Sequence, residues 1–86
     1  MGGVSYGAAR RRGVILRLVK EESGRRNGTF AGALRRYLLA EGHDYSIHNI
    51  NYDLRVLHKE GVIEEIYPSD FTVGNRQRQI HAYRTI

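Results

Sequence analysis

Residues 46–63, with the sequence SIHNINYDLRVLHKEGVI, contain the pattern that decides the fold. On a helix, which turns about 100° per residue, the apolar side chains share an arc of about 80°: Ile47, Ile50, Leu54 and Leu57. Polar side chains share an arc of similar width, centred nearly opposite: His48, Tyr52, Arg55 and Lys59. Ser46 is a favoured N-cap residue, and Gly61 is placed to end the helix. The sequence therefore predicts an amphipathic helix over residues 47–60.

The residues before this segment predict two further helices. Residues 8–23 place four apolar side chains at helical spacing: Val14, Ile15, Leu18 and Val19. Turn-forming residues at 23–28 then break the helix. Thr29 is expected to cap a second helix that extends to Glu41 and is ended by Gly42. The apolar residues of this second helix share one face and should join the core: Phe30, Ala31, Leu34 and Leu38.

After the third predicted helix, the period of the pattern changes from helical to strand-like. Residues 62–67 predict a strand, which is closed by turn-forming residues at 68–70. Residues 71–73 are expected to pair with a last strand, residues 78–85, across a turn at 74–77. Three helices followed by a hairpin is the order of a winged helix-turn-helix domain. We therefore expect the α+β class, with a three-helix winged helix-turn-helix domain and a C-terminal β-hairpin wing.

The length and composition limit the classes of protein to which the chain can belong. Its 86 residues are enough for one domain, which we expect over residues 10–86, preceded by a flexible N-terminal arm at residues 1–9. The absence of cysteine excludes disulfides and thiolate metal sites. No apolar run is long enough for a signal peptide or a membrane span. These features predict an intracellular protein, cytoplasmic or nucleoid-associated, without a membrane partner.

The charge favours an anionic partner and is unevenly distributed. The formal net charge is +5, which attracts polyanions over about 8–10 Å at physiological salt. Residues 1–43 carry nine Lys and Arg against three acids, whereas residues 44–86 carry five against six. A nucleic acid fits this charge, but an acidic protein or an anionic membrane would also fit it.

A family resemblance accompanies these patterns. Residues 46–63 resemble the recognition helix of bacterial and archaeal PadR-like and MarR-like regulators, in which a Ser or Thr cap leads into a helix that ends Leu-x-x-Leu-x-x-x-Gly-Leu-Ile. The matching residues here, with Val in place of the usual Leu, are Leu54, Leu57, Gly61, Val62 and Ile63. Residues 74–83 resemble the basic wing and return strand. The resemblance implies that helix 47–60 enters the major groove and that wing 68–79 lies on the backbone or minor groove.

The residue types on the polar face suit DNA recognition. Asn can bond adenine and Arg can bond guanine through two hydrogen bonds each in the major groove. The candidate base contacts are His48, Asn49, Asn51, Tyr52 and Arg55. The candidate contacts to the backbone or minor groove are Arg10, Arg11, Arg12, Arg25, Arg26, Asn27, Lys59, Arg76 and Arg78.

The sequence predicts a sequence-specific transcriptional regulator that binds double-stranded DNA, expected as a homodimer because one small module reaches the required specificity with difficulty. Regulators of these families usually carry a further helix for dimerisation, which does not follow the wing in this sequence. The alternative is a winged-helix protein-protein interaction subunit of a replication, transcription or packaging complex, because fold does not fix function. RNA binding ranks third, since the tyrosines are scattered along the chain.

The sequence contains no pattern that predicts catalysis or a cofactor. His43, Asp44 and His48 lie near one another, but no third ligand follows at a metal-binding spacing. No nucleophile elbow, phosphate-binding loop or dinucleotide fingerprint occurs. We therefore expect no enzyme activity, no cofactor and no metal, and the sequence identifies no small-molecule ligand.

Overall fold

The computed structural model describes residues 6–66 and 81–86. Within them the chain forms three helices and three short strands: α1 (Tyr6–Arg26), β1 (Thr29–Phe30), α2 (Ala31–Ala40), α3 (Ile47–Lys59), β2 (Ile63–Ile66) and β3 (Ala82–Thr85). The strands make an antiparallel sheet in the order β1-β3-β2. The predicted α+β class and the three helices are therefore confirmed.

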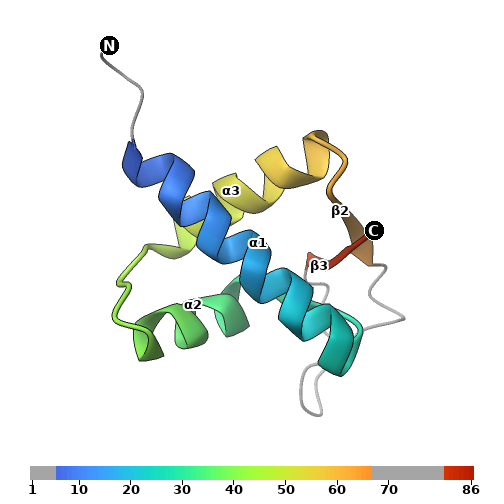
Figure 1. Cartoon of the computed structure of the whole chain (residues 1–86), viewed down its shortest axis with the longest axis horizontal. Coiled ribbons are helices and arrows are strands. Elements are labelled where there is room, and N and C mark those ends of the chain that lie inside the picture. Colours follow the sequence, from blue (N-terminus) through green and yellow to red (C-terminus); the bar gives the residue numbers. More distant parts are fainter. Residues whose placement is uncertain (1–5, 67–80) are drawn as a thin grey trace.

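Helix α1 is the central packing element of the molecule. It runs diagonally across the front of Figure 1 and contacts both other helices as well as β1 and β3. Three of its four predicted core side chains are buried, and Val14 packs against them at the edge. The main core combines these with side chains from α2, α3, β2 and β3: Ile15, Leu18, Val19, Ala31, Leu34, Leu38, Ile50, Leu54, Leu57, Ile63 and Tyr83.

The first helix is longer at both ends than its apolar pattern predicts. It begins at Tyr6, so residues 6–9, which were expected to belong to a flexible arm, are helical. Alanines at positions 8 and 9 favour helix, and the first turns are held by contacts to α3 described below. At the other end, Ser23 Oγ donates to Val19 O at 2.6 Å and accepts from the backbone N–H of Thr85 at 2.9 Å. This hydroxyl joins the end of α1 to β3.

The predicted role of Thr29 as a helix cap is wrong. Thr29 lies in β1, pairs with Tyr83 of β3 and is almost fully buried. Its Oγ1 has no hydrogen-bond partner within the described residues, and α2 begins only at Ala31 without a side-chain cap at Phe30. The physical reason is the turn before it, where Asn27 (φ 67°) and Gly28 (φ 147°) direct the chain along β3.

The ends of α2 and α3 agree with the sequence prediction. The Ser46 side chain accepts a hydrogen bond from the backbone N–H of Asn49 at 3.1 Å, which confirms the N-cap of α3. Gly42 (φ 88°) and Gly61 (φ 81°) both adopt the left-handed conformation just after a helix. In each case the following residue donates its N–H back into the last turn, to Leu38 O at 2.7 Å and to Leu57 O at 3.2 Å.

The sheet confirms two of the predicted strand segments, although their pairing with each other was not predicted. Strand β2 lies inside the predicted segment 62–67, and β3 lies inside the predicted segment 78–85. The two strands pair directly, with Glu64 opposite Arg84 and Glu65 opposite Tyr83. The expected strand 71–73 and wing 68–79, with Arg76 and Arg78, lie outside the described residues.

The geometry at Gly28 predicts a large effect of adding one methyl group. An alanine Cβ there would lie 2.3 Å from Ile66 Cδ1 and 2.7 Å from the carbonyl oxygen of Tyr83. Gly28→Ala should therefore destabilise the fold by about 2–4 kcal/mol, from overpacking and backbone strain together. Gly13→Ala is the matched control, because nothing lies within 4 Å of its added Cβ on α1.

Gly13→Ala should instead stabilise the protein by about 0.5–1 kcal/mol, because alanine is the better helix former. Urea denaturation followed by circular dichroism measures both changes. Equal stabilities of the two variants would contradict the close approach of β1 to β2 and β3 at Gly28.

Candidate functional site

Helix α3 presents two chemically different faces. Its buried side consists of Ile50, Asp53, Leu54 and Leu57, whereas four polar residues of the opposite side are exposed: His48, Tyr52, Arg55 and Lys59. The other two predicted base contacts, Asn49 and Asn51, are half-buried at the edges of this surface. Ile47 was expected in the core but is 41% exposed, because it starts the helix and extends beyond the packed turns.

Arg55 and Lys59, like Arg10, Lys20 and Arg36, are exposed cationic residues. Neither has a carboxylate within ion-pair distance among the described residues, although both lie on one exposed face, one turn apart. Most other described arginines are paired, for example Arg84 with Glu64 at 2.6 Å. The exposed face of α3 therefore offers two positive charges to an external anion.

A buried ion pair holds α3 against the first turns of α1. Asp53 is fully buried, and the Arg11 guanidinium donates to both of its carboxylate oxygens, with Nη2 at 3.1 Å from Oδ1. Arg12 Nε donates to the same Oδ1 at 3.2 Å. The hydrogen bond to Asp53 is the main cause that raises the pKa of Arg11, so this side chain stays charged. The Arg11 guanidinium also lies 5.9 Å from the ring centre of Tyr45.

This arrangement changes the interpretation of the arginine run at residues 10–12. Arg11 and Arg12 were predicted to contact DNA, but the structure places them in the packing of α1 on α3. Arg10 remains exposed. The missed signal was Asp53 itself, which lies between Ile50 and Leu57 on the apolar face of its helix. A carboxylate in that position requires a buried cation.

The second predicted cluster of backbone contacts lies elsewhere than expected. Arg25 and Asn27 were placed before the second helix, at its N-terminal amides. Strand β1 intervenes, so both residues lie at the end of α1 and in the turn after it. Arg25 is exposed, 3.8 Å from a carboxylate oxygen of Glu22, and the side chain of Arg26 lies outside the described residues.

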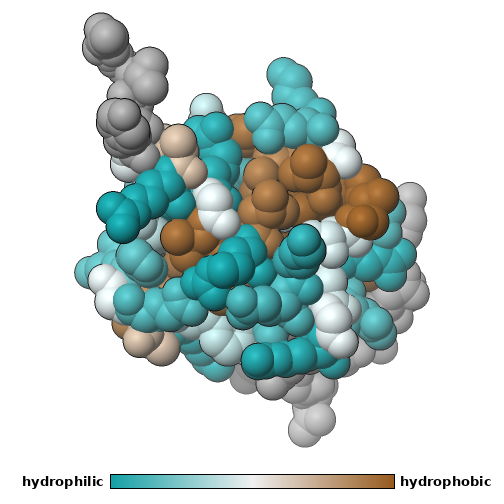
Figure 2. Space-filling view, in the orientation of Figure 1, coloured by the Kyte–Doolittle hydropathy of each residue, from teal (hydrophilic) through white to brown (hydrophobic). Residues whose placement is uncertain are grey.

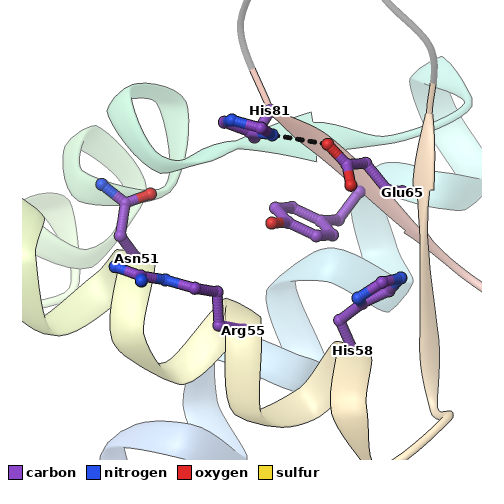
Figure 3. Close-up of a pocket in the computed structure, with 6 residues that line it drawn as sticks. Asn51, Arg55, His58, Glu65 and His81 are labelled. Carbon is purple, nitrogen blue, oxygen red and sulfur yellow. Dashed lines mark hydrogen bonds and ion pairs between the residues drawn. The ribbon is translucent and has the colours of Figure 1, made fainter.

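A hollow of about 400 Å³ lies between α3 and the sheet. Its walls come from α3, β2 and the beginning of β3: Asn51, Arg55, His58, Glu65, His81 and Tyr83. Figure 3 shows the Arg55 side chain extending along α3 toward Asn51, with His81 and Glu65 on the opposite wall. The sequence identified Asn51 and Arg55 but missed the other four, because their approach depends on how β2 and β3 pair.

The groups in this hollow interact with one another. His81 Nδ1 and Glu65 Oε2 are in hydrogen-bond contact, and the ring of His58 meets the ring of Tyr83 edge-on, with 5.9 Å between centres. Burial raises the pKa of Tyr83, the charge of Glu65 raises it further, and Arg55 lowers it. The phenol therefore stays neutral at physiological pH, while both charged partners lie close enough to affect it.

The described residues contain no group of three or more His, Cys, Asp or Glu arranged to hold a metal ion. His43 stacks on Tyr45 with 5.4 Å between ring centres, and Asp44 lies 3.8 Å from Arg35. Each of these residues thus has a neighbour within the fold. No helix in the described part of the chain combines the length and apolarity needed to cross a bilayer.

Comparison of the chain with protein-family models, with curated proteins and with solved structures finds no match. The chemistry of the α3 surface and of the adjoining hollow is therefore the basis for assigning a function.

The buried ion pair predicts that loss of the Asp53 charge destabilises the fold much more than loss of the exposed Glu21 charge. Asp53→Asn keeps the shape but leaves two guanidinium groups without their counter-charge, and should destabilise the fold by about 3 kcal/mol or more. Glu21→Gln, which removes the exposed partner of Arg17, should change stability little, because an exposed ion pair contributes little.

Thermal and urea unfolding of both variants test this difference. If Asp53→Asn unfolds at the wild-type urea concentration, the ion pair does not hold α1 on α3.

Proposed function

We propose that the protein is a winged helix-turn-helix domain that binds double-stranded DNA sequence-specifically, with α3 as the recognition helix, and that it acts as a transcriptional regulator. The observation that carries this proposal is the exposed face of α3. Asn51, Tyr52, Arg55 and Lys59 lie there, while the opposite face is fixed by the core and by Asp53. An α-helix held in this way fits the width of the major groove.

The arrangement of α2 and α3 supports the same proposal. The two helices pack on each other and are joined by a short connection after Gly42. In a helix-turn-helix the first of such a pair crosses the backbone while the second enters the groove. The sheet adjoins α3, and the segment between β2 and β3 contains Arg76 and Arg78, the predicted wing contacts to the backbone or minor groove.

The chemistry of the α3 face matches base edges. Arg55 can donate two hydrogen bonds to guanine, and Asn51 or Asn49 can bond adenine in the same bidentate way. His48 and Tyr52 add donors and acceptors near the start of the helix. Lys59, one turn beyond Arg55, suits a phosphate because an ammonium group acts as a compact point charge.

The two acidic residues of β2 repel DNA from α3 less strongly than the excess of acids in residues 44–86 indicates. Glu64 pairs with Arg84 across the strands, and Glu65 contacts His81. The charge of Glu64 is thereby partly balanced before any DNA approaches, and that of Glu65 is balanced once His81 is protonated. The slightly acidic half of the chain, residues 44–86, can thus still carry a recognition surface.

A homodimer is part of the proposal, because a regulator must exceed its non-specific binding by about 4–10 kcal/mol and one small module reaches this with difficulty. Two copies on a palindromic site would place two α3 helices one helical turn of DNA apart.

A second function, a protein-interaction subunit, is favoured by an exposed apolar surface. Figure 2 shows apolar residues gathered between α1 and the end of α3 and extending toward the C-terminus. Val62 is 40% exposed and Ile86 is 78% exposed, and they adjoin through a backbone hydrogen bond of 3.5 Å. Exposed apolar patches of this kind often mark protein contacts.

Selection from a random duplex DNA pool at two salt concentrations tests the main proposal. Enrichment of a palindrome, with affinity falling steeply as salt rises, is the expected result. The absence of binding at either salt concentration would contradict the DNA function and favour the protein-interaction function.

Two α3 variants should then separate base recognition from phosphate contact. Arg55→Ala should weaken binding by about 1–3 kcal/mol and relax the preference at one base position. Lys59→Ala should weaken binding to all sequences and reduce the slope of log K against log salt by about 0.9. Lys20→Ala removes an exposed charge from α1 and serves as the control, with little effect on either measurement. Equal loss of specificity in both α3 variants would refute this division of roles.

A further inference from the structure

Two imidazoles in the hollow beside α3 have no part in the DNA contacts described so far. His58 comes from the last turn of α3, and His81 lies just before β3; both are exposed and both line the hollow. They come from distant parts of the chain and are brought together by the pairing of β2 with β3. Histidine is the side chain that ordinarily changes charge between pH 5 and 8.

The charge of this hollow depends on the state of those two imidazoles. Among the described residues that line it, the fixed charges are the positive Arg55 and the negative Glu65, which cancel when both imidazoles are neutral. Protonation of either imidazole makes the hollow positive. His81 is in direct contact with Glu65, so protonated His81 neutralises the one carboxylate that would repel an anion.

The other neighbouring groups do not alter this balance. Tyr83 lines the hollow from β3, and its phenol stays neutral because burial raises its pKa. Glu64 of β2 and Arg84 of β3 are joined in their own pair. Among the described residues, the charged or titratable groups that share the hollow with the imidazoles are thus Arg55, Glu65 and Tyr83.

We propose that this hollow binds one phosphate group of the DNA strand beside α3, and that His58 and His81 take up protons when it does so. The inference rests on the DNA-binding function proposed above. Protonated His58 supplies an N–H donor to the phosphate, the positive charge of Arg55 on the wall attracts it, and protonated His81 holds Glu65. Charge-assisted hydrogen bonds of this kind are stronger than neutral ones.

The position of the hollow identifies DNA as the source of the phosphate. Asn51 and Arg55 belong both to the hollow and to the exposed face of α3 (Figure 3), so a strand contacting that face passes the mouth of the hollow. Because protons are taken up on binding, DNA affinity rises as pH falls. This gain in affinity is lost as pH rises through the range in which histidine titrates.

The test measures affinity for a mixed-sequence duplex, by fluorescence anisotropy, from pH 6 to pH 8 at constant ionic strength. We expect wild-type affinity to be about fivefold to tenfold higher at pH 6 than at pH 8. His81→Gln and His58→Gln should each reduce this ratio. In a His48→Gln background, which removes the imidazole on the exposed face of α3, the double variant should abolish it. His43→Gln, which alters a histidine stacked on Tyr45 outside the hollow, should keep the wild-type ratio.

Glu65→Gln should lower the pH ratio by raising the affinity at pH 8, whereas the histidine variants should lower it by reducing the affinity at pH 6. Without the carboxylate, the hollow is positive at pH 8 even when both imidazoles are neutral, so the affinity at pH 8 should rise and the ratio should fall. His81→Gln leaves the ring contact between His58 and Tyr83 intact, so its result does not depend on that packing. Circular dichroism of each variant confirms that it is folded.

The outcomes separate this inference from the proposed function. If the wild-type chain binds no duplex at any pH, both are overturned. If it binds DNA but the double histidine variant keeps the wild-type pH ratio, only the phosphate subsite is overturned. If inorganic phosphate alone shifts the His58 and His81 resonances in NMR spectra while the variants leave DNA binding unchanged, the hollow takes free phosphate rather than a DNA strand.

Discussion

The buried carboxylate of Asp53 is the constraint on which the position of α3 depends. A charge without solvent is costly unless ion pairs and hydrogen bonds compensate it. Here two adjacent residues of α1 do so, since Arg11 contacts both oxygens and Arg12 contacts one. Apolar contacts alone are non-directional, but a two-pronged guanidinium contact fixes rotation as well as distance. The ion pair thereby sets which side of α3 faces outward.

The candidate site follows from that orientation. With Asp53 directed toward α1, the residues on the opposite side of the helix face solvent, including Arg55 and Lys59. Strand β2 starts shortly after α3 ends at Lys59, and its pairing with β3 forms one wall of the hollow that Arg55, Glu65 and His81 line. Arg11 and Arg12 of α1 thus determine which residues α3 exposes, because they fix the orientation of that helix.

The helix faces and caps could be predicted from the sequence because the interactions that determine them are local. The contacts that depend on tertiary structure could not be predicted. The faces of α3, the Ser46 cap and the glycines after α2 and α3 were predicted because each depends on residues within one or two turns. Thr29 was wrongly predicted as a cap because its strand partner, Tyr83, is remote in the sequence. The placement of His58 and His81 beside one hollow was missed because it depends on the register of the sheet. The ion pairs of Arg11 and Arg12 were missed because their partner is a single acid within an apolar stripe.

The order of the strands has a consequence for how the protein is made. Strand β3 lies between β1 and β2 in the sheet, yet it is the last of the three along the chain. Until a ribosome has released it, β1 and β2 have no strand to pair with in the described sheet, and Ile63 lacks the cover that β3 provides. The helices can associate early, since local contacts form fastest. The nascent chain therefore carries an incomplete core with exposed strand edges, which are aggregation-prone, and it becomes native only through its most distant contacts.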